Sequence, residues 1–236
     1  MKNYVIAGGT SGIGRALVDA LLHDGHAVWV LARTQRDLPD HANLTFIETD
    51  FTQEPPLMSA ALPEVINGVA YCPGSIQLMP FHRMKPEVFV QDFSLNVLGA
   101  IQVIQTCLPA LKKAGSASVV LYSTVAVQTG MPFHASVAAS KGAIEGLTRS
   151  LAAEYAASGI RFNAIAPSLT DTPLADKLLN TPEKRENSNK RHPIGRIGNA
   201  HDIAALSAFL FSDNGSWITG QVMHADGGMG ALKLLA

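Results

Sequence analysis

A single charged side chain, Lys141, stands in the run "HASVAASKGAI" at 134–144, among alanines, serines and small apolar residues. If this run is helical, the residue one turn earlier on the same face is Val137. An isopropyl group neither pairs with an ammonium group nor exchanges a proton, so nothing one turn before Lys141 uses its charge. The first question that the sequence raises is therefore which group interacts with the charge of Lys141.

Three glycines, Gly8, Gly12 and Gly14, follow the apolar run "YVIA" in the segment "AGGTSGIGRAL". At a strand-to-helix turn, glycine permits tight backbone angles and lets a pyrophosphate approach the main chain at the helix N-terminus, where free N–H groups favour anions. The spacing is G-x-x-x-G-x-G and differs from the G-x-G-x-x-G dinucleotide motif. We expect this turn to bind a pyrophosphate; the alternative is that the glycines serve only the turn and close helix–strand packing.

The second apolar run ends in "LART", which places Arg33 where a ribose-reading residue is expected. An acidic residue there would accept hydrogen bonds from the adenosine 2′-hydroxyl. A guanidinium group instead suits a 2′-phosphate, to which it can donate two charge-assisted hydrogen bonds. The sequence thus favours NADP(H), with NAD(H) still possible, unless Arg33 is only a solvated loop charge.

The elements that must position these residues alternate along the chain. Short apolar, β-branched runs occupy 4–7, 27–32, 44–48, 68–71, 118–124, 160–166 and 220–225. Between most of them lie longer segments with apolar spacing near 3.6, as at Leu17, Leu21 and Leu22. This alternation predicts an α/β fold: a single-domain, Rossmann-type, doubly wound parallel sheet of about seven strands with helices on both faces. No repeat or linker divides the chain, so we expect one domain over residues 1–236.

Composition restricts the class of partner. The formal net charge is -1 and no segment concentrates lysine or arginine, which argues against nucleic acid and against an anionic membrane surface. Cys72 and Cys107 lack disulfide-framework or metal-ligand spacing, so we expect reduced thiols and no metal site. The segment "MKNYVIAGG" has no signal-peptide pattern, and no uninterrupted apolar run approaches the roughly 18 residues of a membrane span. We expect a cytoplasmic protein with a small-molecule substrate.

Several segments together resemble the short-chain dehydrogenase/reductase family over nearly the whole chain. They are "GGTSGIG" at 8–14, Asp50 after the third strand, Asn96 in "FSLNVLGAI", "ASKGAIEGLTRSLAAEYA", "IRFNAIAP" at 160–167 and "WITGQVMHADGG" near the C-terminus. The resemblance implies a nicotinamide cofactor, hydride transfer between an alcohol and a carbonyl, and a homotetramer or homodimer. Apolar surface at 86–113, at 136–158 and in the C-terminal "GMGALKLLA" adds to the expectation of an oligomer. By resemblance the cofactor contacts are Gly8, Thr10, Ser11, Gly12, Ile13, Gly14, Arg33, Asp50, Phe51, Gly74, Lys141, Pro167 and Thr172.

Two motif positions depart from the family pattern. Cys72-Pro73-Gly74 stands where the family has Asn-Ala-Gly, and Pro167-Ser168 stands where it has Pro-Gly. Thr172 remains placed to reach the carboxamide or phosphate region of the cofactor. Asp50 is implied to bond the adenine, although an aspartate at a strand end is also an ordinary cap of a turn.

The resemblance places Lys141 in a Tyr-x-x-x-Lys motif. There the ammonium group holds the nicotinamide ribose hydroxyls and lowers the pKa of the tyrosine that exchanges the proton. Here the tyrosine position is Val137. Thr124 stands at the position of the substrate-orienting serine, and its hydroxyl can donate the same hydrogen bond. Asn96 is implied to hold a water near Lys141, or else it simply bonds backbone.

Another group must then supply the proton. His134 is our candidate, because imidazole exchanges protons near neutrality, while Ser136 and Ser140 are poor acids. The sequence predicts an NADP(H)-binding oxidoreductase with an altered proton donor, acting on a small carbonyl or alcohol or on an activated double bond. The alternative is a catalytically impaired cofactor-binding protein that acts as a sensor, scaffold or inactive subunit. Residues 169–196, with the polar stretch 181–195, form either a solvated loop or a lid over the substrate.

Overall fold

The computed structural model describes residues 1–53 and 62–233. Seven strands form one parallel sheet in the order β3-β2-β1-β4-β5-β6-β9. Their bounds are β1 (Asn3–Ala7), β2 (Ala27–Ala32), β3 (Leu44–Glu48), β4 (Gly68–Tyr71), β5 (Ala117–Tyr122), β6 (Ile160–Pro167) and β9 (Val222–Ala225). The predicted doubly wound parallel sheet is confirmed, and every strand begins and ends within two residues of its predicted bounds.

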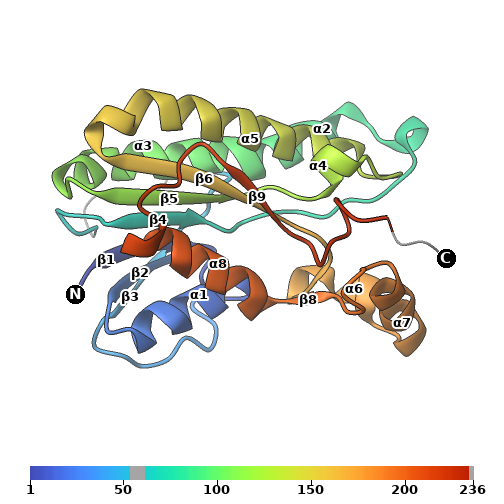
Figure 1. Ribbon diagram of the computed structural model, residues 1–236, viewed down its shortest axis with the longest axis horizontal. Coiled ribbons are helices and arrows are strands. Elements are labelled where there is room, and N and C mark those ends of the chain that lie inside the picture. Colours follow the sequence, from blue (N-terminus) through green and yellow to red (C-terminus); the bar gives the residue numbers. More distant parts are fainter. Residues whose placement is uncertain (54–61, 234–236) are drawn as a thin grey trace.

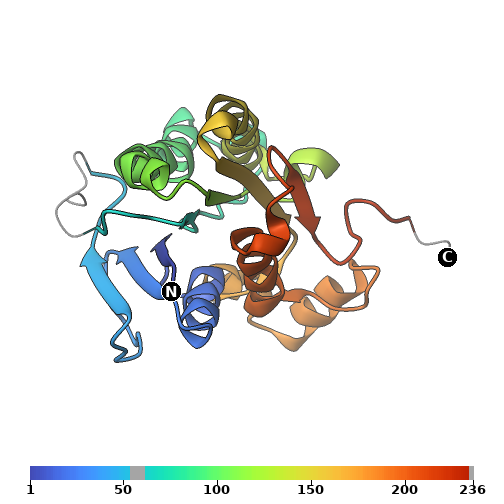
Figure 2. The same ribbon diagram turned by 60° about the vertical axis from the view of Figure 1, so that its left-hand side comes forward.

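Helices cover both faces of the sheet (Figure 1). One face carries α1 (Gly12–His23) and α8 (Ala200–Phe211), and the other carries α2 (Pro86–Phe93), α3 (Gly99–Lys113) and α5 (Ala135–Tyr155). The turned view in Figure 2 shows the sheet between these two layers. The shorter helices are α4 (Ala126–Thr129), α6 (Asp176–Leu179) and α7 (Pro182–Lys190), and single 3₁₀ turns are η2 (Phe81–Arg83), η4 (Ala156–Ser158), η5 (Pro173–Ala175) and η6 (Asp213–Gly215).

Alternate residues of the central strand β1 point to two separate cores. Val5 and Ala7 pack in the core that includes α3 and α5, whereas Tyr4 and Ile6 pack in the core that includes α1 and α8. Side chains alternate between the faces of a strand, so a strand buried on both faces is a continuous apolar run. Burying one large apolar side chain contributes roughly 1.5–3 kcal/mol. This burial is why the apolar runs alone located the strands.

The loops that form the site follow the carboxyl ends of four strands. β1 pairs with both β2 and β4, so the order of the sheet reverses between β1 and β4. A crevice opens outside the strand ends at such a switch point, and ligands of doubly wound sheets bind there. The loops after β1, β4, β5 and β6 bring the glycine-rich turn, Gly74, Thr124 and Ser168 to this edge.

The helical segment Pro86–Lys113 changes its winding at η3 (Ser94–Leu98), a π-helical turn that contains Asn96. Such turns are frequent at functional sites, and the sequence pattern predicted only an ordinary helix here. Of the residues described, this segment alone is long and apolar enough to cross a membrane by length and composition. Its apolar residues Val103, Ile104 and Leu111 are buried in the core of the protein, which accounts for its composition.

The stretch 181–195 is largely helical and so differs from the loose polar loop that was one expectation. α7 begins after Thr181, whose side chain accepts a hydrogen bond from the N–H of Lys184, and Pro182 occupies the first helical turn. These capping signals were present in the sequence. The short strands β7 (Thr170–Asp171) and β8 (Gly198–Asn199) pair with each other, one before this stretch and one after it. At the C-terminus, residues 234–236 of "GMGALKLLA" lie outside the described residues.

Candidate active site

The glycine-rich turn lines a cleft of about 410 Å³ beside the start of α1. Gly8 and Gly12 have φ angles of +73° and +53°, which glycine adopts without strain. A Cβ on Gly14 would lie 2.4 Å from the carbonyl oxygen of Gly8, so no side chain fits there. The first N–H groups of a helix have no partner within it, and the cleft at this helix start therefore favours an anion. The other predicted cofactor contacts that line it are Thr10, Ser11, Ile13, Arg33, Asp50, Phe51, Gly74 and Thr172.

Two guanidinium groups line this cleft just after β2. Arg33 was predicted from the sequence, and Arg36, which was not, stands beside it; both are exposed. Asp50 lines the same cleft, but its carboxylate also accepts hydrogen bonds from the N–H and the hydroxyl of Thr52, at 2.9 and 2.7 Å. These bonds, with a smaller contribution from Arg33, lower the pKa of Asp50. Asp50 therefore caps its own turn as well as facing the cleft.

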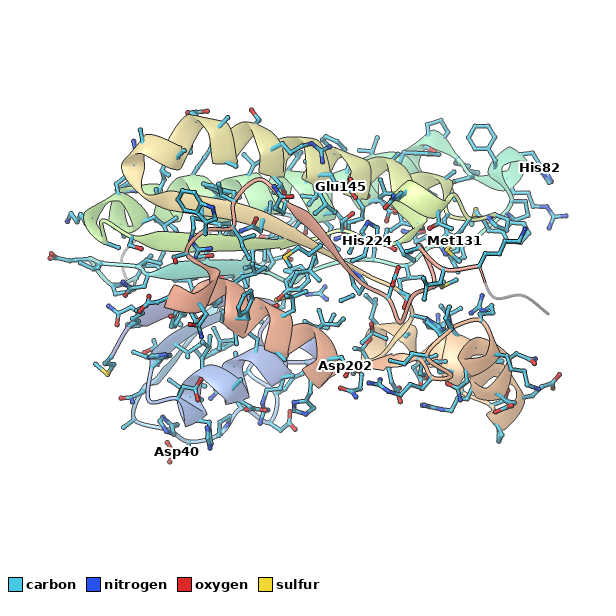
Figure 3. All side chains as sticks on the ribbon, in the orientation of Figure 1. Asp40, His82, Met131, Glu145, Asp202 and His224 are labelled. Carbon is cyan, nitrogen blue, oxygen red and sulfur yellow. The ribbon has the colours of Figure 1, made fainter. Side chains whose placement is uncertain are left out.

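A second cavity, of about 610 Å³, opens at the carboxyl ends of β4, β5 and β6. It meets the first cleft along a shared wall of Ile13, Cys72, Gly74, Thr172 and Leu174. The predicted site residues that line it include Thr124, His134, Lys141 and Pro167, together with Val137. Met131, which also lines it, is labelled in Figure 3 and lies between the layer of α5 and the α6–α7 pair. The structure thus brings together residues that are far apart in the sequence.

Lys141 lines this cavity from α5 and is 8% exposed. Burial lowers the pKa of Lys141 to about 8, against the opposing effects of Cys72 and Asp92. Burial also raises the pKa of the Cys72 thiol to about 12, so at pH 7 the nearby negative charge comes from Asp92. Within the described part of the chain, no side chain hydrogen-bonds or ion-pairs with the ammonium group. A buried charge without a protein partner is available to the oxygen atoms of a ligand.

Asn96 is completely buried next to Gly74. Its Nδ2 donates to the carbonyl oxygen of Asp92 at 2.8 Å and to the hydroxyl of Ser75 at 3.1 Å, whereas its Oδ1 has no partner. A Cβ on Gly74 would lie 3.4 Å from this Oδ1 and 3.7 Å from Nζ of Lys141. The unpaired acceptor and the ammonium group therefore flank the same glycine. That placement suits a water or hydroxyl group that bonds both the Oδ1 of Asn96 and the ammonium group of Lys141. The Nδ2 of Asn96 bonds backbone, which was the other expectation for this residue.

The sequence analysis did not predict Asp92, which is 1% exposed. Its carboxylate accepts hydrogen bonds from the hydroxyls of Ser75, at 2.6 Å, and of Ser136. Ser136 is thus occupied by Asp92 and does not line the cavity, although it adjoins Val137 in the sequence. A buried carboxylate needs such donors. No local pattern marks the cluster, because its members come from three separate segments of the chain.

No phenol faces the cavity. The four tyrosines are all described, and none lines it: Tyr4, Tyr71, Tyr122 and Tyr155. Tyr122 is a core residue whose hydroxyl pairs with that of Ser207 at 2.8 Å. Val137, four residues before Lys141 on α5, lines the cavity with an apolar side chain. The face one turn before the lysine therefore has no group that exchanges a proton.

Thr124 and His134 both line the cavity. The Oγ1 of Thr124 accepts a hydrogen bond from the N–H of Ala126 at 3.3 Å, which leaves its O–H able to donate to a ligand. His134 stands at the N-cap position of α5, and its Nδ1 lies 2.7 Å from the carbonyl oxygen of Pro132. Since a carbonyl only accepts, Nδ1 of His134 donates and Nε2 remains for another partner.

A serine–histidine pair that the sequence analysis did not recognise forms another part of the cavity wall. Oγ of Ser168 lies 2.8 Å from Nε2 of His192, and Ser168 lines the cavity. The sequence analysis noted Ser168 only as a departure from a Pro-Gly motif. No signal could have joined it to a histidine 24 positions away. Among the described residues, no group of histidine, cysteine, aspartate and glutamate side chains is arranged to hold a metal ion.

Comparison with known proteins agrees with this architecture. The sequence profile described as enoyl-(acyl carrier protein) reductase matches residues 7–230. A tropinone reductase homolog of Arabidopsis thaliana is 33% identical over 246 residues, which cover 96% of this chain and 92% of the relative. The crystal structure of a short chain dehydrogenase family protein from Francisella tularensis has a TM-score of 0.88 at 29% identity and covers 98% of this chain and 100% of that one. The structure of ElxO with NADP bound has a TM-score of 0.88 at 24% identity, over 97% and 98% of the two chains, and so shares the fold.

The doubly wound sheet with a glycine-rich turn at its switch point defines the class as a Rossmann-type α/β protein. Within that class, the chain belongs to the short-chain dehydrogenase/reductase family of oxidoreductases. The family suggested by the sequence motifs is thereby confirmed.

Proposed function

We propose that this protein is an NADP(H)-dependent oxidoreductase that acts on a small carbonyl compound or alcohol, or on an activated double bond. The observation that carries the proposal is Lys141. Its buried, unpartnered ammonium group lies near the unpaired Oδ1 of Asn96, at a cavity that adjoins a phosphate-binding cleft. A nicotinamide dinucleotide bound across the two cavities supplies or takes up the hydride.

The residues of the two cavities fit the parts of such a cofactor. The turn that contains Gly8, Gly12 and Gly14 would hold the pyrophosphate at the start of α1. Arg33 and Arg36 would bind a 2′-phosphate, for which planar guanidinium groups are suited. ElxO, a protein of the same fold, has been solved with NADP bound, which supports a dinucleotide in this cleft.

Lys141 and Thr124 would act on the reacting end. The ammonium group of Lys141 would donate hydrogen bonds to the hydroxyls of the nicotinamide ribose, and the O–H of Thr124 would donate to the substrate oxygen. Val137 leaves no phenol to exchange the proton, so the donor is altered. His134, which lines the cavity, is the donor that the sequence suggested.

The charges around the substrate cavity favour an anionic substrate. Lys177, Lys184 and Arg191 line it together with Lys141, whereas no aspartate or glutamate is among its lining residues. The Nζ of Lys184 bonds only uncharged oxygens, and Arg191 donates to a serine hydroxyl. Lys177, Lys184 and Arg191 all lie in residues 169–196, which the sequence analysis offered as either a solvated loop or a lid over the substrate. We propose a ketone, enone or imine that carries a carboxylate or phosphate group.

The cofactor proposal is tested by titrating NADPH and NADH into the protein and following cofactor fluorescence. We expect NADPH to bind more tightly, and Arg33→Ala to weaken NADPH binding by roughly 10–100-fold while leaving NADH unchanged, since one charged hydrogen bond contributes roughly 1.5–3 kcal/mol. Arg83→Ala, at an exposed arginine of η2, is the matched control. Equal affinities of the native protein for the two cofactors would remove Arg33 from this role.

The reaction is tested by following NADPH oxidation with pyruvate, 2-oxobutyrate and 4-oxocyclohexanecarboxylate beside their uncharged counterparts acetone, butanone and cyclohexanone, and with the uncharged enone cyclohex-2-enone. We expect turnover only of carboxylates, and loss of that preference in a Lys177→Ala/Arg191→Ala variant. Val137→Tyr restores a phenol one turn before Lys141, and should raise ketone reduction toward the 10²–10⁴-fold that a positioned acid provides, if the cavity accepts the ring. NADPH binding without turnover of any compound would instead favour the sensor, scaffold or inactive subunit.

A further inference from the structure

Ser168 and His192 form a hydrogen-bonded pair at the wall of the substrate cavity. Ser168 follows β6 and lines the cavity, and His192, which is 3% exposed, lies behind it two residues after the end of α7. Oγ of Ser168 lies 2.8 Å from Nε2 of His192, and Nδ1 of His192 lies 2.8 Å from the carbonyl oxygen of Ser188. Both ring nitrogens therefore have fixed partners.

The carbonyl group of Ser188 determines which nitrogen of His192 carries the hydrogen. A carbonyl oxygen only accepts, so Nδ1 donates, and Nε2 of the neutral ring accepts from the hydroxyl of Ser168. When the ring gains a second proton, Nε2 donates to Oγ of Ser168, and the serine hydroxyl turns to another acceptor. The carbonyl oxygen of Asp226 lies 3.3 Å from that Oγ. The pair can thus hold or release a proton without leaving a buried polar atom unpaired.

The pair shares its cavity with Lys141 and Thr124. Only the serine end reaches the cavity, since His192 is not among the residues that line it. A substrate oxygen in the cavity would therefore meet the hydroxyl of Ser168. His134, the histidine that does line this cavity, bonds through Nδ1 to the carbonyl oxygen of Pro132, and among the described residues its Nε2 has no hydrogen-bond partner.

We propose that Ser168 and His192 form the proton relay of this protein, an inference that rests on the proposed function. In ketone reduction, the carbonyl carbon accepts a hydride with its electron pair from the reduced nicotinamide cofactor, and the π electrons of the C=O bond move to oxygen. That oxygen takes the hydroxyl proton of Ser168, whose oxygen takes the Nε2 proton of the His192 imidazolium. The imidazole that results regains a proton from water through Ser168 once the product leaves. Alcohol oxidation reverses each transfer.

Charged and titratable groups from several elements lie around the pair and its cavity. They are Asp226 and His224 at the end of β9, Arg191 next to α7, and Lys141, Lys177 and Lys184 in the cavity lining.

The relay is tested first by activity, with the ketone that the native protein reduces best in the panel above. We expect Ser168→Ala and His192→Asn each to lower kcat by about 10²–10³-fold with NADPH affinity changed less than twofold, because general acids contribute of this order. The kcat of the double variant should be nearly the same as that of either single variant, because each single substitution already interrupts the same proton path. The fall of the native rate toward alkaline pH should have one step fewer in His192→Asn, where the deprotonation of Lys141 remains. His201→Asn, at an exposed histidine, is the matched control.

A second readout needs no turnover. In nitrogen-edited NMR of the protein without cofactor, neutral His192 should be protonated at Nδ1. Ser168→Ala, which removes one oxygen atom at the cavity wall, should shift the Nε2 resonance of His192 but not those of His201.

The outcomes separate the two proposals. NADPH binding with no turnover of any compound would end the proposed function, and the relay with it. Native turnover that survives Ser168→Ala and His192→Asn, or that is lost in His134→Ala instead, would overturn the relay alone. An unmoved Nε2 resonance in Ser168→Ala would also overturn it, because the hydrogen bond on which it depends would be missing.

Discussion

Replacing Lys141 by methionine should make this protein more stable at neutral pH, even though Lys141 is the residue that carries the proposed function. The pKa of Lys141 falls from 10.5 to about 8 in the folded protein, chiefly through burial. This difference corresponds to about 3 kcal/mol of cost for holding the charged form in the fold. Below pH 8 the lysine is protonated in both the folded and the unfolded state, so the folded protein bears the full cost. Methionine fills a similar volume without the charge.

The sign of the pH dependence follows from proton counts. Between pH 8 and pH 10.5 the unfolded chain binds more protons at Lys141 than the folded chain does, so native stability rises with pH through this window. Lys141→Met lacks this rise. The advantage of the variant should thus be largest at pH 7, up to about 3 kcal/mol, and should shrink steadily above pH 8.

Urea unfolding at pH 7, 8, 9 and 10, at one fixed protein concentration, measures this difference. Lys177→Met, at an exposed lysine, is the control and should show neither the gain nor the altered slope. Because the loss of Lys141 also leaves the buried carboxylate of Asp92 without its nearby cation, the gain should fall below the full amount. A variant that is less stable than the native protein at pH 7, by an amount that does not change with pH, would refute the reasoning.

Three further results are expected. Gly14→Ala should lower the melting temperature and abolish NADPH binding, because its Cβ would lie 2.4 Å from a backbone oxygen; circular dichroism and cofactor fluorescence check this. Asp92→Asn should lower the pKa of Lys141 further, since Asp92 raises it, as competitive amine labelling against pH would show. Sedimentation should give a dimer or tetramer of the 25.0 kDa chain, and Val90→Glu, at an apolar residue 67% exposed near Leu98, should shift the population toward monomer.

The fold could be predicted because its signals are local. Each central strand is a short apolar run buried on both faces, and the helices between them show the spacing of an amphipathic helix. The elements that sequence reasoning missed have weak local signals or depend on distant partners. β7 and β8 are two residues each and exist only because they pair with each other. The π-helical turn at Asn96 has an ordinary apolar pattern in the sequence, and the side chain of Asn96 bonds Ser75, which is distant in the sequence, and the carbonyl oxygen of Asp92.

The candidate site also has one part that the sequence predicts and one part that it does not. The glycine-rich turn is contiguous in the sequence, so its glycines and its place after β1 were enough to locate the cleft that it lines. The reacting end is assembled from loops after different strands. Ser75 and Asp92 lie 17 positions apart between β4 and β5, and Ser168 and His192 lie 24 positions apart between β6 and β9, so each pair meets only when its own connection has folded. Pairs of this kind have no spacing rule, and no sequence pattern could have predicted them.

The cost of the polar groups at this edge bears on whether the protein binds a ligand there. Lys141 is a largely buried cation without a side-chain partner among the described residues, and the Oδ1 of Asn96 is one of two fully buried side-chain nitrogen or oxygen atoms there that lack a hydrogen bond. A fold gains nothing from either, since an unpaired buried acceptor alone costs about 1–3 kcal/mol. Both lie beside Gly74, whose missing side chain keeps the space next to them open. A molecule with hydroxyl groups bound at that point would satisfy both atoms at once, which is why we infer that the destabilisation at this site is offset when the cofactor binds.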